Sequence, residues 1–199
     1  LVGHEGRITG AAFSPDGRQL ASASLGRRVD LWDLATGELR HTLPHDGAVV
    51  GVAFTSDRRL ASAGEDKVVR VWDATTGREG LCLGGHDRQC GCVAFSTAGW
   101  RLATAINGGP IRVWAATPLQ GHERQETLSV TPNGDEVWSV AVSPVDGQKI
   151  VSAGWGMMSA KVWDVRTGTV SVPFRGHRTI VFCVAWQSDG RRIASAGQD

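Results

Sequence analysis

The sequence contains no tyrosine, only two methionines and no apolar stretch as long as a membrane-spanning helix. Such a helix needs roughly 18–20 consecutive apolar residues, so we expect a protein without a membrane span. The first four residues also lack the positive and apolar regions of a signal peptide. A balance of 21 basic against 20 acidic residues gives a net charge of +1, which argues against a dedicated nucleic-acid binder. At 41% hydrophobic residues, the chain is too apolar to be disordered.

Cysteine is also scarce, with four residues in the chain, namely Cys82, Cys90, Cys92 and Cys183. Cys90 and Cys92 are two positions apart, which places both side chains on one face of a strand. This spacing is not the C-x-x-C of zinc or redox motifs. We therefore expect small buried thiols in a reducing cytoplasm, with a disulfide or a metal role as the alternative.

Tryptophan, by contrast, occurs eight times, and four of the eight recur at a regular period. Trp32, Trp72, Trp114 and Trp163 are separated by 40, 42 and 49 residues. A short pattern of apolar and small residues with a Ser or Thr precedes each of them and occurs once more near residue 195. Its five copies are residues 20–24, 60–64, 102–105, 150–154 and 193–197. Recurrence at a period of about 40 residues is the signature of a repeat architecture.

Each repeat unit has the composition of short antiparallel strands. Its apolar residues are small or β-branched, and turn sequences such as Pro-Asp-Gly or Thr-Gly separate them. No stretch shows a sustained 3.6-residue period, so helices should be few or absent. The first unit predicts strands near Ile8–Phe13, Leu20–Ser24, Val29–Asp33 and Leu39–Leu43. One such sheet cannot bury both of its faces, so we expect the sheets to stack around an axis as a β-propeller.

Dipeptides at the two ends of the units resemble those of the WD40 repeat family. Unit starts carry Gly3-His4, Gly85-His86 and Gly176-His177, with Pro44-His45 as a variant. Unit ends carry Trp32-Asp33, Trp72-Asp73 and Trp163-Asp164, whereas Trp114-Ala115 departs from the pattern. The resemblance covers essentially the whole chain, and five recurrences make it specific.

The resemblance implies an all-β fold and a single WD40 repeat region over residues 1–199. The unit boundaries predict four complete four-stranded blades and half of a fifth, over residues 7–43, 48–84, 89–130, 135–175 and 180–199. WD40 propellers most often have seven blades, which at about 40 residues each need roughly 280 residues. We therefore expect a segment of a larger ring that packs against the remaining blades of its own propeller. A four-bladed ring closed by residues 1–4 is the alternative.

In this family a His, a Ser or Thr, an Asp and the Trp form a buried hydrogen-bonded tetrad within a blade. The second unit matches the tetrad in full, with His45, Ser62, Asp66 and Trp72. The fifth unit matches as far as the sequence runs, with His177, Ser195 and Asp199. Elsewhere Gly26, Gly108 and Met157 occupy the position that aligns with the Asp. We expect those blades to hold fewer of these hydrogen bonds.

The start of the fourth repeat has two candidates. His122 follows a glycine, but in the other units the His lies four residues before the first apolar strand residue, and that count selects Asn133. With Asn133, Glu126–Val130 is the outer strand of the third blade and Pro118–Arg124 is an enlarged loop. The alternative is an insertion after His122.

No catalytic constellation is present in the sequence. It lacks a G-x-S-x-G elbow and a Walker A loop, and the recurrent His residues belong to the repeat. We therefore expect neither enzymatic activity nor a cofactor or metal requirement. The expected function is a cytoplasmic scaffold for protein or peptide partners. The alternative is a regulatory or docking propeller of a larger signalling enzyme, such as a serine/threonine protein kinase.

The resemblance also indicates which loops would bind a partner. In WD40 proteins the face that most often binds partners carries the turns that enter the first strand of each blade and those that join the second and third strands. Trp138 and Phe182 come from adjacent blades and form a candidate aromatic anchor pair, with blade packing as the alternative. Trp100 and Trp155 are assigned to turns, as surface or inter-blade contacts. The proposed protein-binding residues are Arg7, Glu65, Glu136, Trp138, Phe182 and Gln198; the same positions also include Thr9, Ala48, Val50, Gln89, Asn107 and Ile180.

Overall fold

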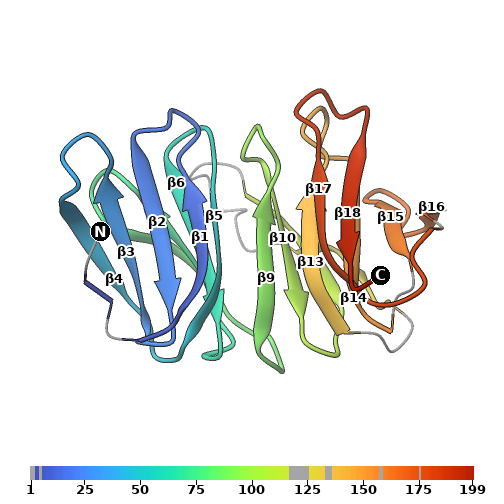
Figure 1. The fold of residues 1–199 in the computed structure, drawn as a ribbon, viewed down its shortest axis with the longest axis horizontal. Helices are drawn as coiled ribbons and strands as arrows, with labels where there is room; N and C mark the ends of the chain where they lie inside the picture. The colour runs from blue at the N-terminus through green and yellow to red at the C-terminus, as the bar shows by residue number, and fades with distance from the viewer. Residues whose placement is uncertain (1–2, 5, 117–125, 133–135, 157–158, 175) are drawn as a thin grey trace. The chain divides into compact units, whose positions relative to one another are not determined.

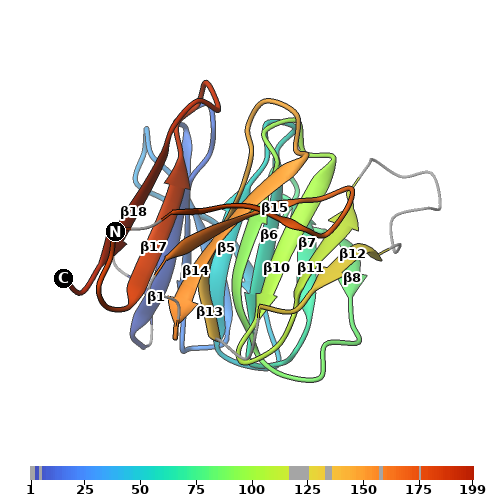
Figure 2. The same ribbon diagram turned by 90° about the vertical axis from the view of Figure 1, so that its right-hand side faces the viewer.

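The computed structural model describes residues 3–4, 6–116, 126–132, 136–156, 159–174 and 176–199. Every regular element within these ranges is a β-strand (Figures 1 and 2), which confirms the all-β prediction. No helix among the described residues could therefore cross a membrane. The chain divides into two compact units, residues 1–90 and 91–199, and each is described by itself.

The first unit contains two four-stranded antiparallel sheets, with strand orders β1-β2-β3-β4 and β5-β6-β7-β8. We call these sheets blades one and two. Blade one comprises β1 (Ile8–Phe13), β2 (Gln19–Ser24), β3 (Arg28–Asp33) and β4 (Leu39–Pro44). Blade two comprises β5 (Val49–Phe54), β6 (Arg59–Gly64), β7 (Val69–Asp73) and β8 (Glu79–Leu83).

The second unit contains two further four-stranded sheets, blades three and four, and a two-stranded sheet, blade five. Blade three comprises β9 (Cys90–Phe95), β10 (Arg101–Ile106), β11 (Ile111–Ala115) and β12 (Glu126–Val130). Blade four comprises β13 (Glu136–Val142), β14 (Lys149–Trp155), β15 (Ala160–Asp164) and β16 (Val170–Phe174). Blade five comprises β17 (Val181–Trp186) and β18 (Ile193–Gly197).

The outer strand of blade three bears on the start of the fourth repeat. β12 pairs with β11, with Ile111 opposite Val130, as the register that begins the fourth repeat near residue 133 requires. His122 and Asn133 themselves, and the loop expected over 118–124, lie outside the described residues.

The second strand of each four-stranded blade is buried on both faces, and its sequence reflects this. In β6, five consecutive residues from Leu60 to Gly64 are buried, whereas the outer strand β8 is exposed at Glu79 and Gly80. Small residues in the second strand let neighbouring sheets approach closely on both sides. A strand buried on both faces reads as a run of apolar and small residues rather than an alternation, which explains the repeated Leu-Ala-Ser-Ala motif.

In the first unit, the hydrophobic core lies between blades one and two. Leu31 and Leu43 from blade one pack in the same cluster as Val49, Leu60 and Trp72 from blade two. A polar link joins the same two blades, because the Thr9 hydroxyl donates to the Val49 carbonyl oxygen at 2.5 Å. Each sheet thus buries a face against its neighbour.

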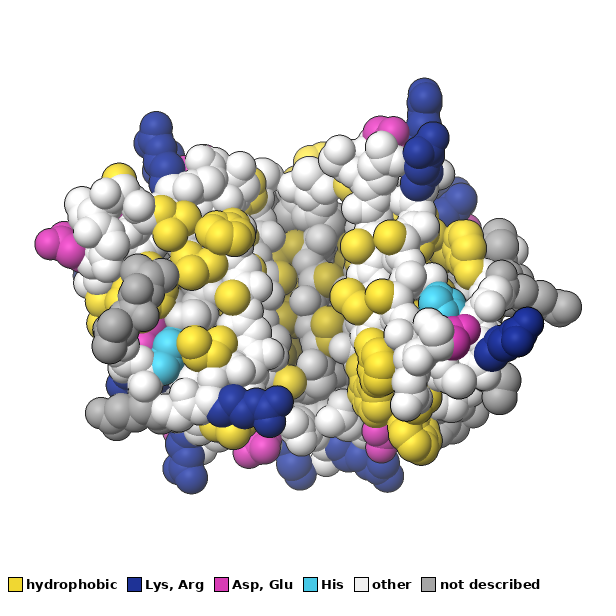
Figure 3. Space-filling view, in the orientation of Figure 1, with side chains coloured by type: hydrophobic (Ala, Val, Ile, Leu, Met, Phe, Trp, Pro, Cys, Tyr) yellow, Lys and Arg dark blue, Asp and Glu magenta, His cyan; other side chains and the backbone are white. Residues whose placement is uncertain are grey.

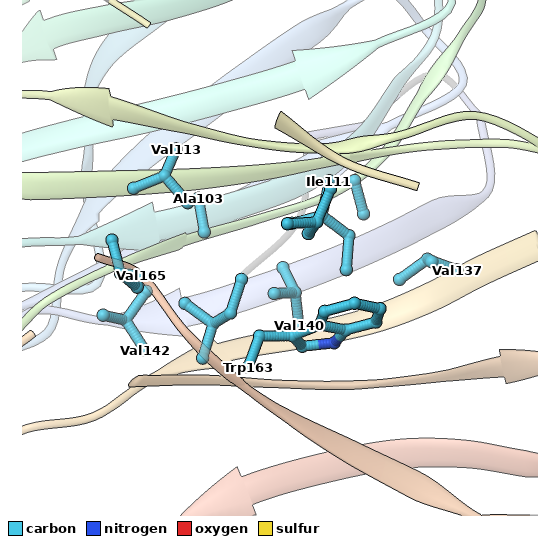
Figure 4. Close-up of a cluster of buried hydrophobic side chains, with 11 residues drawn as sticks. Ala103, Ile111, Val113, Val137, Val140, Val142, Trp163 and Val165 are labelled. Carbon is cyan, nitrogen blue, oxygen red and sulfur yellow. The ribbon is translucent and has the colours of Figure 1, made fainter. Parts of the chain in front are cut away.

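In the second unit, the same packing joins blade four to blades three and five. Figure 4 shows Trp163 beside Val140 of its own blade, in a cluster that includes Ile111 and Val113 of blade three. On its other face, blade four packs against Val181 and Val184 of blade five. The periodic indoles therefore lie within hydrophobic cores, with Trp32, Trp72, Trp114 and Trp163 only 4–6% exposed.

The Asp of the Trp-Asp dipeptide closes the turn between the third and fourth strands. Oδ1 of Asp33 accepts the backbone N–H groups of Ala35 and Thr36 at 2.8 and 3.2 Å. These hydrogen bonds lower the pKa of Asp33. Gly37 completes the turn at φ 74°, a conformation that glycine adopts without strain. Asp73 and Asp164 accept equivalent backbone bonds.

All four cysteines are free, but they are not uniformly buried as expected. Cys90 is buried and Cys92 half-buried, whereas Cys82 and Cys183 are exposed. Cys82 lies on the outer strand of blade two and Cys183 on the two-stranded blade five, where less protein covers each side chain. Burial raises the pKa of the Cys92 thiol.

Candidate functional site

Blade two holds a complete hydrogen-bonded tetrad. The Trp72 indole N–H donates to the Ser62 hydroxyl at 2.8 Å, and this hydroxyl lies 2.7 Å from Nε2 of His45. Nδ1 of His45 lies 3.3 Å from the Asp66 carboxylate. With the imidazole proton on Nδ1, donors run in one direction from Trp72 to Asp66. The tetrad ties the Trp strand to the start of the repeat.

Arg70 adds a positive charge to this tetrad. It bonds the Asp66 carboxylate, and its other groups reach Asp46 at 2.9 Å and Glu79 at 3.2 Å. Burial and then the Arg70 charge lower the pKa of His45, although Asp66 opposes both effects. Burial alone would raise the pKa of Asp66, but the Arg70 hydrogen bond and the nearby cationic charges bring it below its usual value.

In blade one, a carboxylate from another strand lies near the histidine in place of the missing Asp. Trp32 donates to Ser22 at 2.8 Å, and Ser22 lies 2.5 Å from Nε2 of His4. Gly26 provides no acid, but the fully buried Asp30 on β3 places a carboxylate oxygen 3.3 Å from Nδ1 of His4. This contact is an ion pair and not a hydrogen bond, so blade one holds fewer of the tetrad hydrogen bonds than blade two, as expected.

Asp30 has further partners besides His4. Arg28 lies 3.3 Å from the same carboxylate oxygen, and the Thr42 hydroxyl donates to the other oxygen at 3.0 Å. These contacts offset the cost of burying the charge.

Bonds of the tetrad recur in the remaining blades. Trp114 donates to Thr104 at 3.1 Å in blade three, and Trp163 donates to Ser152 at 2.8 Å in blade four. In blade five, the structure brings together the three residues predicted there: Nε2 of His177 lies 2.9 Å from Ser195 and Nδ1 lies 2.8 Å from Asp199. The His177 contact, followed by the Arg178 backbone N–H, lowers the pKa of Asp199.

A β-bulge recurs in the first strand of four blades, and it sets the direction of one side chain. The register shifts between Ile8 and Gly10, and at the corresponding place in β5, β13 and β17. A bulge leaves one residue unpaired and can redirect its side chain. The extra residues are Thr9, Val50, Trp138 and Phe182.

In blades four and five the bulge residues are aromatic, and they stack. The rings of Trp138 and Phe182 are parallel to within 4°, with centroids 5.7 Å apart. Trp155, at the end of β14, has its ring centroid 6.0 Å from that of Trp138, with a tilt of 48°. We call these three rings the aromatic cluster. Its members remain accessible: Trp155 is 56% and Phe182 45% exposed, and Trp138 is half-buried.

Glu136 lies at the edge of the aromatic cluster. Its carboxylate accepts the Trp138 indole N–H at 3.2 Å, and its backbone pairs directly with Trp155 across the two strands. Gly154 makes this bulge possible, because a Cβ at that position would overlap the Glu136 carbonyl group. Figure 3 shows hydrophobic side chains gathered over the lower end of β17, with an acidic side chain beside them.

Trp155 is the residue that sequence reasoning placed incorrectly. It was assigned to a turn, but it is the last residue of β14 and joins the aromatic cluster. Its pairing with Glu136 depends on the β13–β14 register, which shifts at the bulge between Val137 and Ser139. Trp100, in contrast, lies in the turn before β10 and is 64% exposed.

The other proposed binding residues include three accessible side chains. Arg7 is exposed just before β1, Glu65 is exposed just after β6, and Gln198 is exposed just after β18. Among the described residues, no group of His, Cys, Asp or Glu side chains could hold a metal ion.

The strand order, the recurrent tetrads and the buried periodic indoles define a repeat protein built of four-stranded antiparallel blades. The family described as WD domain, G-beta repeat matches residues 1–33, 37–73 and 168–199. Because these matches cover more than half of the chain, the chain belongs to the WD40 repeat family. Proteins of this family generally act as scaffolds for protein interactions.

Curated relatives carry a range of names. The chain is 23% identical to Autophagy-related protein 16 of Arabidopsis thaliana, over all of this chain and 47% of the relative. It is 32% identical to a U3 small nucleolar RNA-associated protein 15 homolog of Xenopus laevis, over 94% of this chain and 35% of the relative. It is 31% identical to Apoptotic protease-activating factor 1 of Rattus norvegicus, over 87% of this chain and 14% of the relative. The chain therefore spans less than half of the length of these relatives.

Proposed function

We propose that this chain is part of a non-catalytic scaffold that binds a protein or peptide through the aromatic cluster of blades four and five. The observation that carries the proposal is the stacked pair of Trp138 and Phe182 on adjacent blades, with Trp155 beside it. Aromatic side chains are enriched among the residues that dominate binding energy. Two of the three rings are about half exposed, and such surface is favourable to cover.

The tetrads support the scaffold part of the proposal. In blade two, the potentially reactive side chains of His45, Ser62 and Asp66 are hydrogen-bonded to one another or to Trp72. These side chains are buried or nearly so. A buried and fully partnered imidazole has no open position for a substrate. We therefore assign these residues to stability and not to catalysis.

The same proposal includes a cytoplasmic location and the absence of nucleic-acid binding. Four free thiols suit a reducing compartment, and a net charge of +1 provides little attraction for phosphates. Because the chain spans less than half of the relatives, a catalytic domain elsewhere on a longer polypeptide, such as a kinase, remains the alternative.

The test compares partner capture by three forms of the chain. We expect the double variant Trp138→Ala/Phe182→Ala to lose the proteins that the parent captures from cells, as quantified by mass spectrometry. Trp100→Ala is the matched control, because it removes an exposed tryptophan from a turn in the same unit. Thermal melts establish that all three forms are folded. An unchanged set of captured proteins in the double variant would contradict the proposal.

A further inference from the structure

We propose that the aromatic cluster and Glu136 bind the guanidinium group of an arginine side chain on the protein partner. This inference rests on the proposed function, since it specifies the chemistry of the partner at the same surface.

The stacking arrangement determines which aromatic faces are open. Phe182 covers one face of Trp138, with the two rings parallel to within 4°. Trp155 stands at 48° to Trp138, and 56% of Trp155 is exposed. Trp138 is therefore the ring that contacts both of the others. The accessible ring that adjoins Glu136 is that of Trp155.

The charge next to the Trp155 ring is the negative charge of Glu136. Glu136 uses its carboxylate to accept the Trp138 indole N–H at 3.2 Å. No basic side chain of the described ranges forms an ion pair with Glu136. A carboxylate has capacity for about four hydrogen bonds, so it retains acceptor capacity toward solvent.

Cross-strand pairing places the carboxylate and the Trp155 ring side by side. Glu136 and Trp155 are directly opposite in the β13–β14 register. Opposite residues of an antiparallel pair have Cβ atoms about 4.5–5.5 Å apart. One ligand group can therefore contact the indole face and the carboxylate together.

An electron-rich ring face beside a carboxylate favours the binding of a cationic group over that of an apolar group. The face of an indole attracts cations within about 6 Å of its centroid. A guanidinium matches both parts of this surface, because it is planar enough to stack on a ring and donates paired N–H groups to a carboxylate. An ammonium is a compact point charge and makes only one of these contacts well. The geometry therefore points to arginine.

The test uses blocked tripeptides, acetyl-Ala-X-Ala-amide, in which X is arginine, citrulline, lysine or norleucine. Citrulline is the matched control, because it keeps the planar shape of arginine without its charge. Binding to the intact chain is followed by NMR of the tryptophan indole N–H signals. We expect the arginine peptide to shift the Trp138 and Trp155 signals, but not Trp100, with a dissociation constant on the order of 1 mM. We expect citrulline and norleucine to bind about fivefold more weakly.

Two variants test the individual groups. Glu136→Gln preserves an acceptor for the Trp138 indole, so it should keep the fold and weaken the arginine peptide about fivefold, with no effect on the citrulline peptide. Trp155→Leu should weaken the arginine peptide by a similar factor. Citrulline or norleucine binding as tightly as arginine would overturn the cation assignment. Lysine binding as tightly as arginine would overturn the assignment of a guanidinium.

The two proposals can fail separately. If the arginine peptide shows no preference but Trp138→Ala/Phe182→Ala still loses its captured proteins, the surface binds a partner of different chemistry. If the arginine peptide binds as expected but capture is unchanged in the double variant, the cation site is real and the proposed scaffold surface lies elsewhere.

Discussion

Blades two and four have the same four-stranded order but use polar and aromatic residues in different places. Blade two has a Trp–Ser–His–Asp tetrad in its interior, reinforced by Arg70, and carries only Val50 at its bulge. Blade four retains the Trp163–Ser152 bond in its interior but carries Trp138 at the bulge, next to Glu136.

The difference separates two tasks within one repeat. Interior hydrogen bonds stabilise a blade but are inaccessible to a partner, whereas the bulge residues are half-buried or exposed. Blade one supports this view, because Asp30 restores the carboxylate contact from a different strand. The charge contact to the interior histidine is thus present in blades one and two, while the bulge residue differs from blade to blade.

The largest expected effect tests whether blade one truly resembles blade two. Asp30→Ala should lower the free energy of unfolding by about 4 kcal/mol, because it leaves His4 and Arg28 beside a buried site without their carboxylate. Urea denaturation followed by tryptophan fluorescence measures this change. Asp46→Ala is the control, because this exposed partner of Arg70 should contribute at most about 1 kcal/mol. Equal losses for the two variants would contradict the role of Asp30.

A second pair of variants breaks the comparison directly. Ser62→Ala removes the partner of both Trp72 and His45, so it should cost about 3 kcal/mol. Ser152→Ala removes one side-chain hydrogen bond among the described residues, that of Trp163, and should cost roughly half as much. The same denaturation measurement applies. A cost for Ser152→Ala equal to or above that for Ser62→Ala would show that the full tetrad adds nothing to blade two.

The bulge of blade four is tested with Gly154→Ala. The added Cβ would overlap the Glu136 carbonyl group, so we expect a loss of about 2 kcal/mol in stability together with weaker binding of the arginine peptide. Gly64→Ala makes the equivalent change in blade two and should reduce stability without affecting the peptide. Gly84→Ala, where a Cβ meets nothing, is the neutral control. Unchanged peptide binding in Gly154→Ala would separate the bulge from the binding surface.

The smallest expected effect is a pH dependence that originates in blade two. Because the pKa of His45 is lower in the folded chain than its ordinary 6.5, the unfolded chain binds the proton more readily. Stability should therefore fall as the pH drops below 6.5 and level off below the folded pKa. The lowered pKa of Asp66 adds a second loss below its ordinary 3.8.

His45→Asn is the matched variant for this pH dependence. It should be less stable than the parent at pH 7.5 and show a shallower decline between pH values of about 6.5 and 5. Urea denaturation at a series of pH values measures both slopes. An identical decline in parent and variant would assign the pH dependence to another group.

The fold could be predicted because its determinants recur at fixed positions along the chain. The periodic Trp and the Ser ten or eleven residues earlier form their hydrogen bonds within a blade, so spacing alone identifies them. Asp30 could not be found in this way, because its contact with His4 depends on which residues face inward on a neighbouring strand. Trp155 was missed for a similar reason, since its pairing with Glu136 follows from a register that contains a bulge.

The most direct test measures arginine-peptide binding to Ser62→Ala and to Trp138→Ala/Phe182→Ala at a temperature at which both are folded. The account predicts that Ser62→Ala binds the peptide as the parent does despite its lower stability, whereas the double variant binds at least about fivefold more weakly. The same affinity in both variants would contradict the separation of interior stability from recognition at the bulges.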